Sequence, residues 1–101
     1  MSQKWDNAKT EQLIEVILAL QTKDEARRFL RDLLTESELV EFGNRWKAVR
    51  MLGQKVSYTS IRDKTGLSTA TIARISKWLK EGMGGYRLML GRLHHAHLSQ
   101  K

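Results

Sequence analysis

The chain has 101 residues, with no cysteine, no proline and a formal net charge of +7 at pH 7. This length suits one domain with a modest core, and the lack of cysteine excludes disulfides and thiolate metal sites. The longest apolar run, residues 13–20, is too short to cross a bilayer, and the first twelve residues contain no signal-peptide core. We therefore expect a cytoplasmic protein that makes no contact with membranes.

Apolar residues recur at helical spacing and strand-like alternation is absent, so the sequence predicts an all-α domain over residues 1–101. Its expected parts are a flexible arm at 1–9, dimerisation and core helices at 10–53, a helix-turn-helix at 57–81 and a C-terminal helix at 86–97. Trp5 is the one large apolar residue of the arm. We expect it to pack on the chain's own core, and docking on a partner is the alternative.

The first half of the chain contains three predicted helices. Residues 10–20 are apolar on two sides, which indicates burial by more than this chain alone. Thr22 and Thr35 each precede a glutamate by three residues, the capping-box pattern that opens a helix. The helix that follows Thr35 is expected to end near Gly53. Its inward side chains should be Leu39, Phe42, Trp46 and Val49.

Residues 57–81 have the pattern of two short helices joined by a tight turn. The first should run from about Thr59 to Thr65, and Gly66 can adopt the left-handed conformation that ends a helix. Ser68 is a suitable N-cap for the second helix. The expected core consists of Ile61, Leu67, Ile72 and Ile75, extended by Trp78 and Leu79. This is the helix-turn-helix pattern, whose second helix can lie in the DNA major groove.

The outer face of the second helix is small or basic, which suits close approach to base edges. Residues expected to face bases are Ser68, Thr69, Ala70 and Ala73. Lys77 lies on the same face but further along, where a phosphate contact is an equal alternative. On the first helix, the expected phosphate contacts are Thr59, Ser60, Arg62 and Lys64. Phosphate contacts position a protein on DNA but carry little sequence information.

The positive charge is concentrated in the same part of the chain. Residues 45–80 contain nine lysines and arginines and one acidic residue, a net +8, whereas residues 1–44 contain six basic and nine acidic residues, a net −3. A basic segment that coincides with a reading motif is typical of a nucleic-acid-binding protein. We therefore favour a sequence-specific DNA-binding transcriptional regulator. The alternative is a helical protein-interaction or adaptor module with incidental or non-specific DNA binding.

The C-terminal segment contains three histidines. His94 and His97 would lie one helical turn apart and could chelate a metal, with His95 between them. No further ligand follows them, so a solvated tail without metal is the favoured interpretation. The chain also lacks a cysteine nucleophile, a glycine-rich phosphate loop and paired carboxylates beside a histidine. Neither enzyme activity nor a cofactor is therefore expected.

Several apolar faces on short helices are difficult to bury within about 100 residues, which favours oligomerisation. Symmetric dimers are the commonest solution. A homodimer would place two reading helices about 34 Å apart, one turn of DNA. Its binding site in double-stranded DNA would then be a near-palindromic operator.

The chain resembles the Trp repressor superfamily over about residues 10–93, and more closely its YerC/YecD-like branch. The matching stretches are residues 22–35, Arg45 with its helix, residues 65–75 and residues 84–90. The resemblance implies an all-helical, intertwined homodimer that binds operator DNA and regulates transcription, and we expect a repressor. Arg62 departs from the small residue usual at its place, and it either strains the helix pair or reaches outward along its stem.

The resemblance also implies an effector pocket formed by the polar groups that surround bound tryptophan in the Trp repressor. The corresponding positions are Thr35, Arg45, Thr71 and Arg74. Ile75 replaces the glycine that makes room for the indole, and Trp78 replaces a serine that helps to bind the amino group. Because both side chains should fill the cavity, we expect that L-tryptophan is not the effector. A contact to the DNA backbone or a structural ion pair is then the favoured role of Arg45 and Arg74.

Overall fold

A computed structural model describes residues 3–99, and it describes side chains for residues 3–94. The described residues form helices without any strand, which confirms the all-α class. The helices are α1 (Ala8–Ala19), α2 (Lys23–Leu33), α3 (Glu36–Gly53), α4 (Tyr58–Thr65), α5 (Thr69–Glu81) and α6 (Gly85–Ser99). The chain divides into two compact units between Leu39 and Val40. In the described part of the chain, no helix is long and apolar enough to cross a membrane.

Side-chain caps start the first three helices. Helix α1 begins at Ala8, two residues earlier than predicted. Asn7 caps it, because its Oδ1 accepts hydrogen bonds from the backbone amides of Lys9 and Thr10. The Thr22 hydroxyl caps α2 by accepting from the Glu25 amide at 3.1 Å. Thr35 and Glu38 form the full reciprocal box: each side chain accepts from the other's amide, at 3.1 and 2.9 Å. Both predicted capping boxes therefore mark real helix starts.

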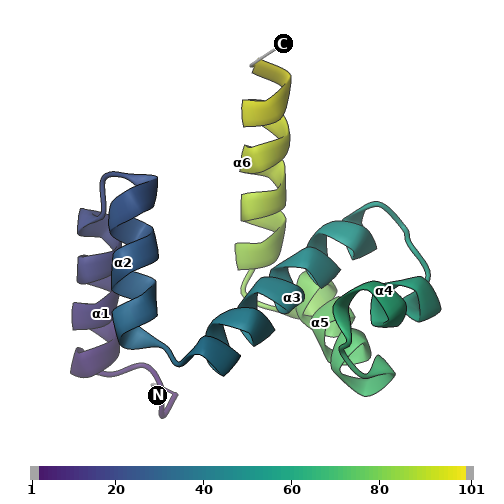
Figure 1. Cartoon of the computed structure of the whole chain (residues 1–101), viewed down its shortest axis with the longest axis horizontal. Coiled ribbons are helices and arrows are strands. Elements are labelled where there is room, and N and C mark those ends of the chain that lie inside the picture. The colour runs from purple at the N-terminus through teal and green to yellow at the C-terminus, as the bar shows by residue number, and fades with distance from the viewer. Residues whose placement is uncertain (1–2, 100–101) are drawn as a thin grey trace. The chain divides into compact units, whose positions relative to one another are not determined.

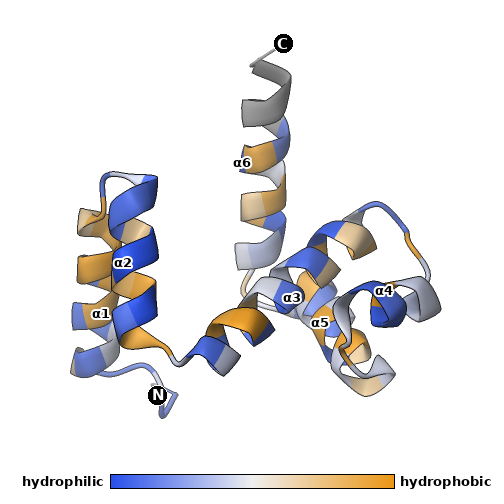
Figure 2. Cartoon of the chain, viewed as in Figure 1, coloured by the Kyte–Doolittle hydropathy of each residue, from blue (hydrophilic) through white to orange (hydrophobic). Residues whose placement is uncertain are grey.

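The first unit forms a helical hairpin of α1 and α2 (Figure 1) and has no buried side chain between residues 3 and 39. The exposed large apolar side chains of α1 and α2 are Leu13, Ile14, Val16, Ile17, Leu18, Leu30 and Leu33. Leu18 is 79% exposed, and Figure 2 shows the apolar character of α1. Because hydrophobic stabilisation is roughly proportional to the apolar area removed from water, this hairpin alone gains only part of what full burial of these side chains would give.

The second unit contains the core. Its buried apolar residues are Ala48, Val49, Met51, Ile61, Leu67, Ile72 and Ile75. They come from α3, α4, the turn after α4, and α5, so this core joins three helices. Trp46, Leu52, Val56, Tyr86 and Leu90 pack around it. The four core residues predicted for the helix-turn-helix are all buried.

Three aromatic side chains lie outside the core, contrary to prediction. Trp78 and Phe42 are each 46% exposed, and Trp5 is exposed as well. Trp78 lies at the flank of the buried stripe that contains Ile72 and Ile75, rather than at its centre. Phe42 precedes the part of α3 against which the core packs, so it has no core neighbours to cover it.

Helix α3 ends at Gly53 as predicted, but this glycine does not form the turn. The left-handed residue that follows the helix is Lys55, with φ 63°. A Cβ atom at Gly53 would lie 3.4 Å from Cδ1 of Leu90. A methyl group at Gly53 would therefore make an ordinary contact with Leu90 of α6, and the turn depends on another residue.

The two glycines Gly66 and Gly43 provide a matched stability test. Gly66 has φ +75°, whereas Gly43 lies within α3, and a Cβ atom would meet nothing within 4 Å at either position. Gly66→Ala should lower the free energy of unfolding by about 1–2 kcal/mol through backbone strain. Gly43→Ala should raise it by about 0.5–1 kcal/mol. Urea unfolding at one fixed protein concentration measures both, and effects of the same sign would contradict this account.

Candidate nucleic-acid interface

The turn between α4 and α5 is held by backbone and side-chain hydrogen bonds. Gly66 adopts the left-handed conformation, and its amide donates to the Arg62 carbonyl at 2.8 Å. The buried Thr65 hydroxyl donates to the Ile61 carbonyl at 2.7 Å and accepts from the Leu67 amide at 3.2 Å. These bonds direct Leu67 into the core. The angle between the two helices is therefore set by buried contacts.

The start of α5 is capped by Ser68 as predicted. Its Oγ accepts from the Thr71 amide at 3.1 Å and lies 3.0 Å from Thr71 Oγ1. Arg74 Nη2 donates to the same Thr71 oxygen at 3.3 Å. Thr71 and Arg74, two of the predicted effector residues, are thus linked to each other and to the cap.

The predicted reading face of α5 is exposed. Its residues are Ser68, Thr69, Ala70, Ala73 and Lys77, all of which are accessible to solvent. Ile72 and Ile75 on the same helix are completely buried. The core therefore anchors one face of α5 and leaves a small-residue face free to approach a groove.

The predicted phosphate-binding residues of α4 lie near the surface. Thr59, Arg62 and Lys64 are exposed, and Ser60 is half-buried. Arg62 Nη2 lies 3.4 Å from Asp63 Oδ1, so its side chain reaches outward and does not enter the helix pair. The Ser57 hydroxyl accepts from the Ser60 amide at 3.2 Å and so caps α4.

Most of the positive charge of residues 45–80 is exposed and has little compensation. The exposed basic residues are Lys47, Arg50, Lys55, Arg62, Lys64, Arg74, Lys77 and Lys80. Among the described residues, ion pairs in this segment involve only Arg45, with Glu41, and Arg62, with Asp63. Exposed pairs of this kind are weak. The surface therefore suits a polyanion.

Arg45 is held by its own helix. Its Nη2 donates to Glu41 Oε2 at 2.9 Å, and its guanidinium lies 5.7 Å from the centre of the Phe42 ring. Arg45 Nε is buried and has no hydrogen-bond partner among the described residues. Thr35, the fourth predicted effector residue, belongs to the first unit, where it caps α3.

The two side chains expected to fill the effector cavity differ in position. Ile75 is completely buried in the core, as expected for a residue that removes space. Trp78 is half-exposed in the single chain because it lies on the flank of α5, beside Lys77. Its place in an effector cavity stays a prediction.

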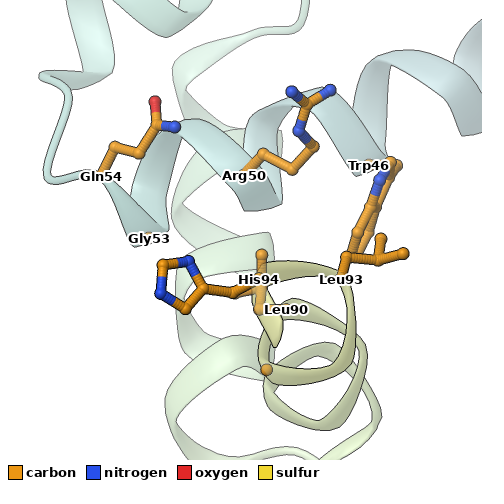
Figure 3. Close-up of a pocket in the computed structure, with 8 residues that line it drawn as sticks. Trp46, Arg50, Gly53, Gln54, Leu90, Leu93 and His94 are labelled. Atoms are coloured by element: carbon orange, nitrogen blue, oxygen red, sulfur yellow. The ribbon is translucent and has the colours of Figure 1, made fainter. Parts of the chain in front are cut away.

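An open cleft of about 730 Å³ lies between α3 and α6 (Figure 3). Its lining residues are Trp46, Arg50, Gly53, Gln54, Leu90, Gly91, Leu93 and His94. In Figure 3 the Arg50 guanidinium and the Gln54 amide extend away from α6, which leaves a mainly apolar wall. The Trp46 and Tyr86 rings are 6.5 Å apart. None of the predicted effector residues is among these lining residues.

Sequence reasoning missed this cleft because it depends on where α6 lies relative to α3. The available signal was a set of apolar residues on both helices, among them Trp46 and Leu90. The prediction about the histidines can be followed only in part, since the side chains of His95 and His97 lie outside the described residues. His94 lines the cleft. No group of three metal-ligating side chains occurs among the described residues.

The comparisons with known proteins agree with the helical arrangement. The profile of the family named Trp repressor protein matches residues 8–94. The chain belongs to the Trp repressor family. It is 37% identical over 83 residues to the uncharacterized protein YerC of Bacillus subtilis (strain 168), a match that covers 82% of this chain and 80% of that protein.

Two solved structures of the family are similar over almost the whole chain. One is a TrpR-like protein from Eubacterium eligens ATCC 27750, with a TM-score of 0.86 and 36% identity. The other is a candidate Trp repressor from Staphylococcus aureus, with a TM-score of 0.83 and 30% identity. Each match covers 92% of this chain and 96% of the other chain. The all-helical, Trp-repressor-like fold of the chain is therefore confirmed, whereas the intertwined dimer stays a prediction.

Proposed function

We propose that this protein is a sequence-specific DNA-binding transcriptional repressor that acts as a homodimer through a helix-turn-helix. One observation carries the proposal: α5 exposes a face of small residues and Lys77 while its opposite face is locked into the core. The surrounding segment, residues 45–80, has a net charge of +8. Membership of the Trp repressor family supports the same conclusion.

In this proposal α5 enters the major groove and α4 lies across the phosphate backbone. Ser68, Thr69, Ala70 and Ala73 have short side chains, so the helix backbone can come close to the bases. Arg62 and Lys64 on α4 supply charges to the phosphates, together with Thr59 and Ser60. Lys77, further along α5, contacts either a base edge or a phosphate. The four short side chains of α5 read the bases, whereas the α4 side chains position the protein on the DNA.

A second copy of the chain completes the first unit in this proposal. No side chain of residues 3–39 is buried, although α1 and α2 carry seven exposed large apolar residues. Self-association would remove that apolar area from water, and a two-fold dimer makes both copies equivalent. Two equivalent reading helices then require a near-palindromic operator, with half-sites about 34 Å apart.

The same apolar surface favours one alternative function. If it binds a different protein, the chain is an interaction or adaptor module whose DNA binding is incidental. The positive segment separates the two candidates, since an adaptor has no need of strong, salt-dependent binding to DNA. The DNA-binding experiment below therefore decides between them.

Fluorescence anisotropy on a selected operator and on random double-stranded DNA tests the proposed docking. The wild type should bind with a steep salt dependence and should enrich a near-palindrome from a random pool. Lys64→Ala should weaken binding to both DNAs alike and reduce the slope of log K against log salt by about one. Thr69→Ala should weaken operator binding roughly fivefold and leave random DNA unchanged.

If the two variants behave identically on both DNAs, the assigned docking is wrong. A wild-type protein that shows no binding to either DNA at low salt would support the adaptor function instead. Steep salt dependence without any enriched sequence would indicate a non-specific binder, which would contradict sequence-specific regulation by the purified protein.

The role of α1 in self-association can be tested at Leu18. Leu18→Asp places a charge on an apolar surface and should convert the dimer to a monomer, or weaken it at least tenfold, because the carboxylate would have to be desolvated. Gln12→Asp adds the same charge at an exposed polar position of α1 and should leave the dimer intact. Light scattering coupled to size-exclusion chromatography measures the mass. A monomeric wild type would contradict the proposed dimer.

The proposed repressor does not respond to L-tryptophan, because Ile75 occupies the position where the family's pocket has a glycine. Isothermal titration of the protein with L-tryptophan, alone and with DNA, should show no saturable heat at micromolar concentrations. The opposite change, Ile75→Gly, would open that space, but it would also remove a completely buried side chain. Saturable micromolar binding to the wild type would refute this prediction.

A further inference from the structure

The chain reverses after α3 through a lysine. Lys55 has φ 63° and is the one non-glycine residue with positive φ among the described residues. Its amide donates to the Leu52 carbonyl at 3.0 Å, and the Val56 amide donates to the Met51 carbonyl at 3.0 Å. This pair of hydrogen bonds is the Schellman motif that closes a helix, in which glycine is the usual left-handed residue.

The geometry of this turn is required by the fold, whereas the lysine side chain is not. Val56 packs against the core beside the buried Met51, and Ser57 then caps α4. Any residue that adopts the left-handed conformation would deliver Val56 to the same place. Glycine would do so with less strain, because only glycine has no Cβ to clash with the neighbouring carbonyl. Glycine at this position would therefore give a more stable fold than lysine does.

The surroundings of Lys55 indicate what its side chain could contribute. The side chain is exposed and leaves the chain two residues before the cap of α4. The backbone beneath it is held from both sides, by the two hydrogen bonds of the turn and by Val56 in the core. A compact ammonium group is thus carried at a defined point on the positively charged unit. Strained backbone conformations of this kind cluster at functional sites.

We infer that Lys55 is a phosphate contact of the DNA-bound protein, kept in a strained backbone conformation for its charge. This inference rests on the proposed DNA-binding function and extends the phosphate-binding surface from α4 to the turn that precedes it. It has a distinctive consequence: at this position, the change that stabilises the fold should weaken DNA binding.

Three variants of Lys55 and one control test the inference. Lys55→Gly should raise the thermal unfolding midpoint by about 2–5 °C, since it removes the strain. The same variant should lose about three- to tenfold in affinity for random double-stranded DNA at low salt, with a salt slope about 0.9 smaller. Lys55→Gln should reduce the slope equally without the gain in stability. Lys55→Arg should keep the slope.

The control is Lys9→Gln, which removes one exposed positive charge from α1 in the first unit. It should leave the salt slope unchanged. The inference is overturned if Lys55→Gln and Lys9→Gln change the salt slope equally. It is also overturned if neither variant changes the slope while binding by the wild type depends steeply on salt. A wild type without salt-dependent binding would instead overturn the proposed function itself. The unfolding midpoints confirm that each variant is folded.

Discussion

The second unit depends on the burial of four branched side chains: Val49, Ile61, Ile72 and Ile75. They come from α3, α4 and α5 and are completely buried in one cluster, so the core joins these three helices. Branched side chains have few rotamers and interiors are close-packed, so these contacts leave little freedom for the helices to shift. The core therefore fixes the orientation of the exposed face of α5. A groove-reading surface requires that kind of rigid support.

A single copy of the chain leaves two surfaces exposed, one positively charged and one apolar. The segment from residue 45 to residue 80 exposes eight basic side chains, and few acidic groups lie against them. The helices α1 and α2 expose seven large apolar side chains, and no side chain between residues 3 and 39 is buried. The first feature suits a polyanion and the second an apolar surface. A homodimer on DNA satisfies both together, which is why the proposed function explains more of the structure than the adaptor alternative does.

The residues at the predicted effector positions bond to neighbours on their own helices. Thr71 and Arg74 hydrogen-bond along α5, and Arg45 pairs with Glu41 on α3. Arg45 nevertheless keeps a buried Nε without a partner among the described residues. A buried donor of this kind is costly, on the order of 1–3 kcal/mol. Ile75 is completely buried beneath α5, at the position where the resemblance implies room for an indole ring.

Local patterns in the sequence determined the helices, their caps and the α4–α5 turn, because Ser57, Ser68, Thr35 and Gly66 act through bonds to near neighbours. The core isoleucines also followed from helical periodicity. Only the tertiary structure showed that Trp78 and Phe42 stay exposed, and that Lys55 rather than Gly53 closes α3. These features depend on how the helices pack against one another. The spacing of apolar residues along a helix does not specify which part of the apolar stripe is covered by another helix.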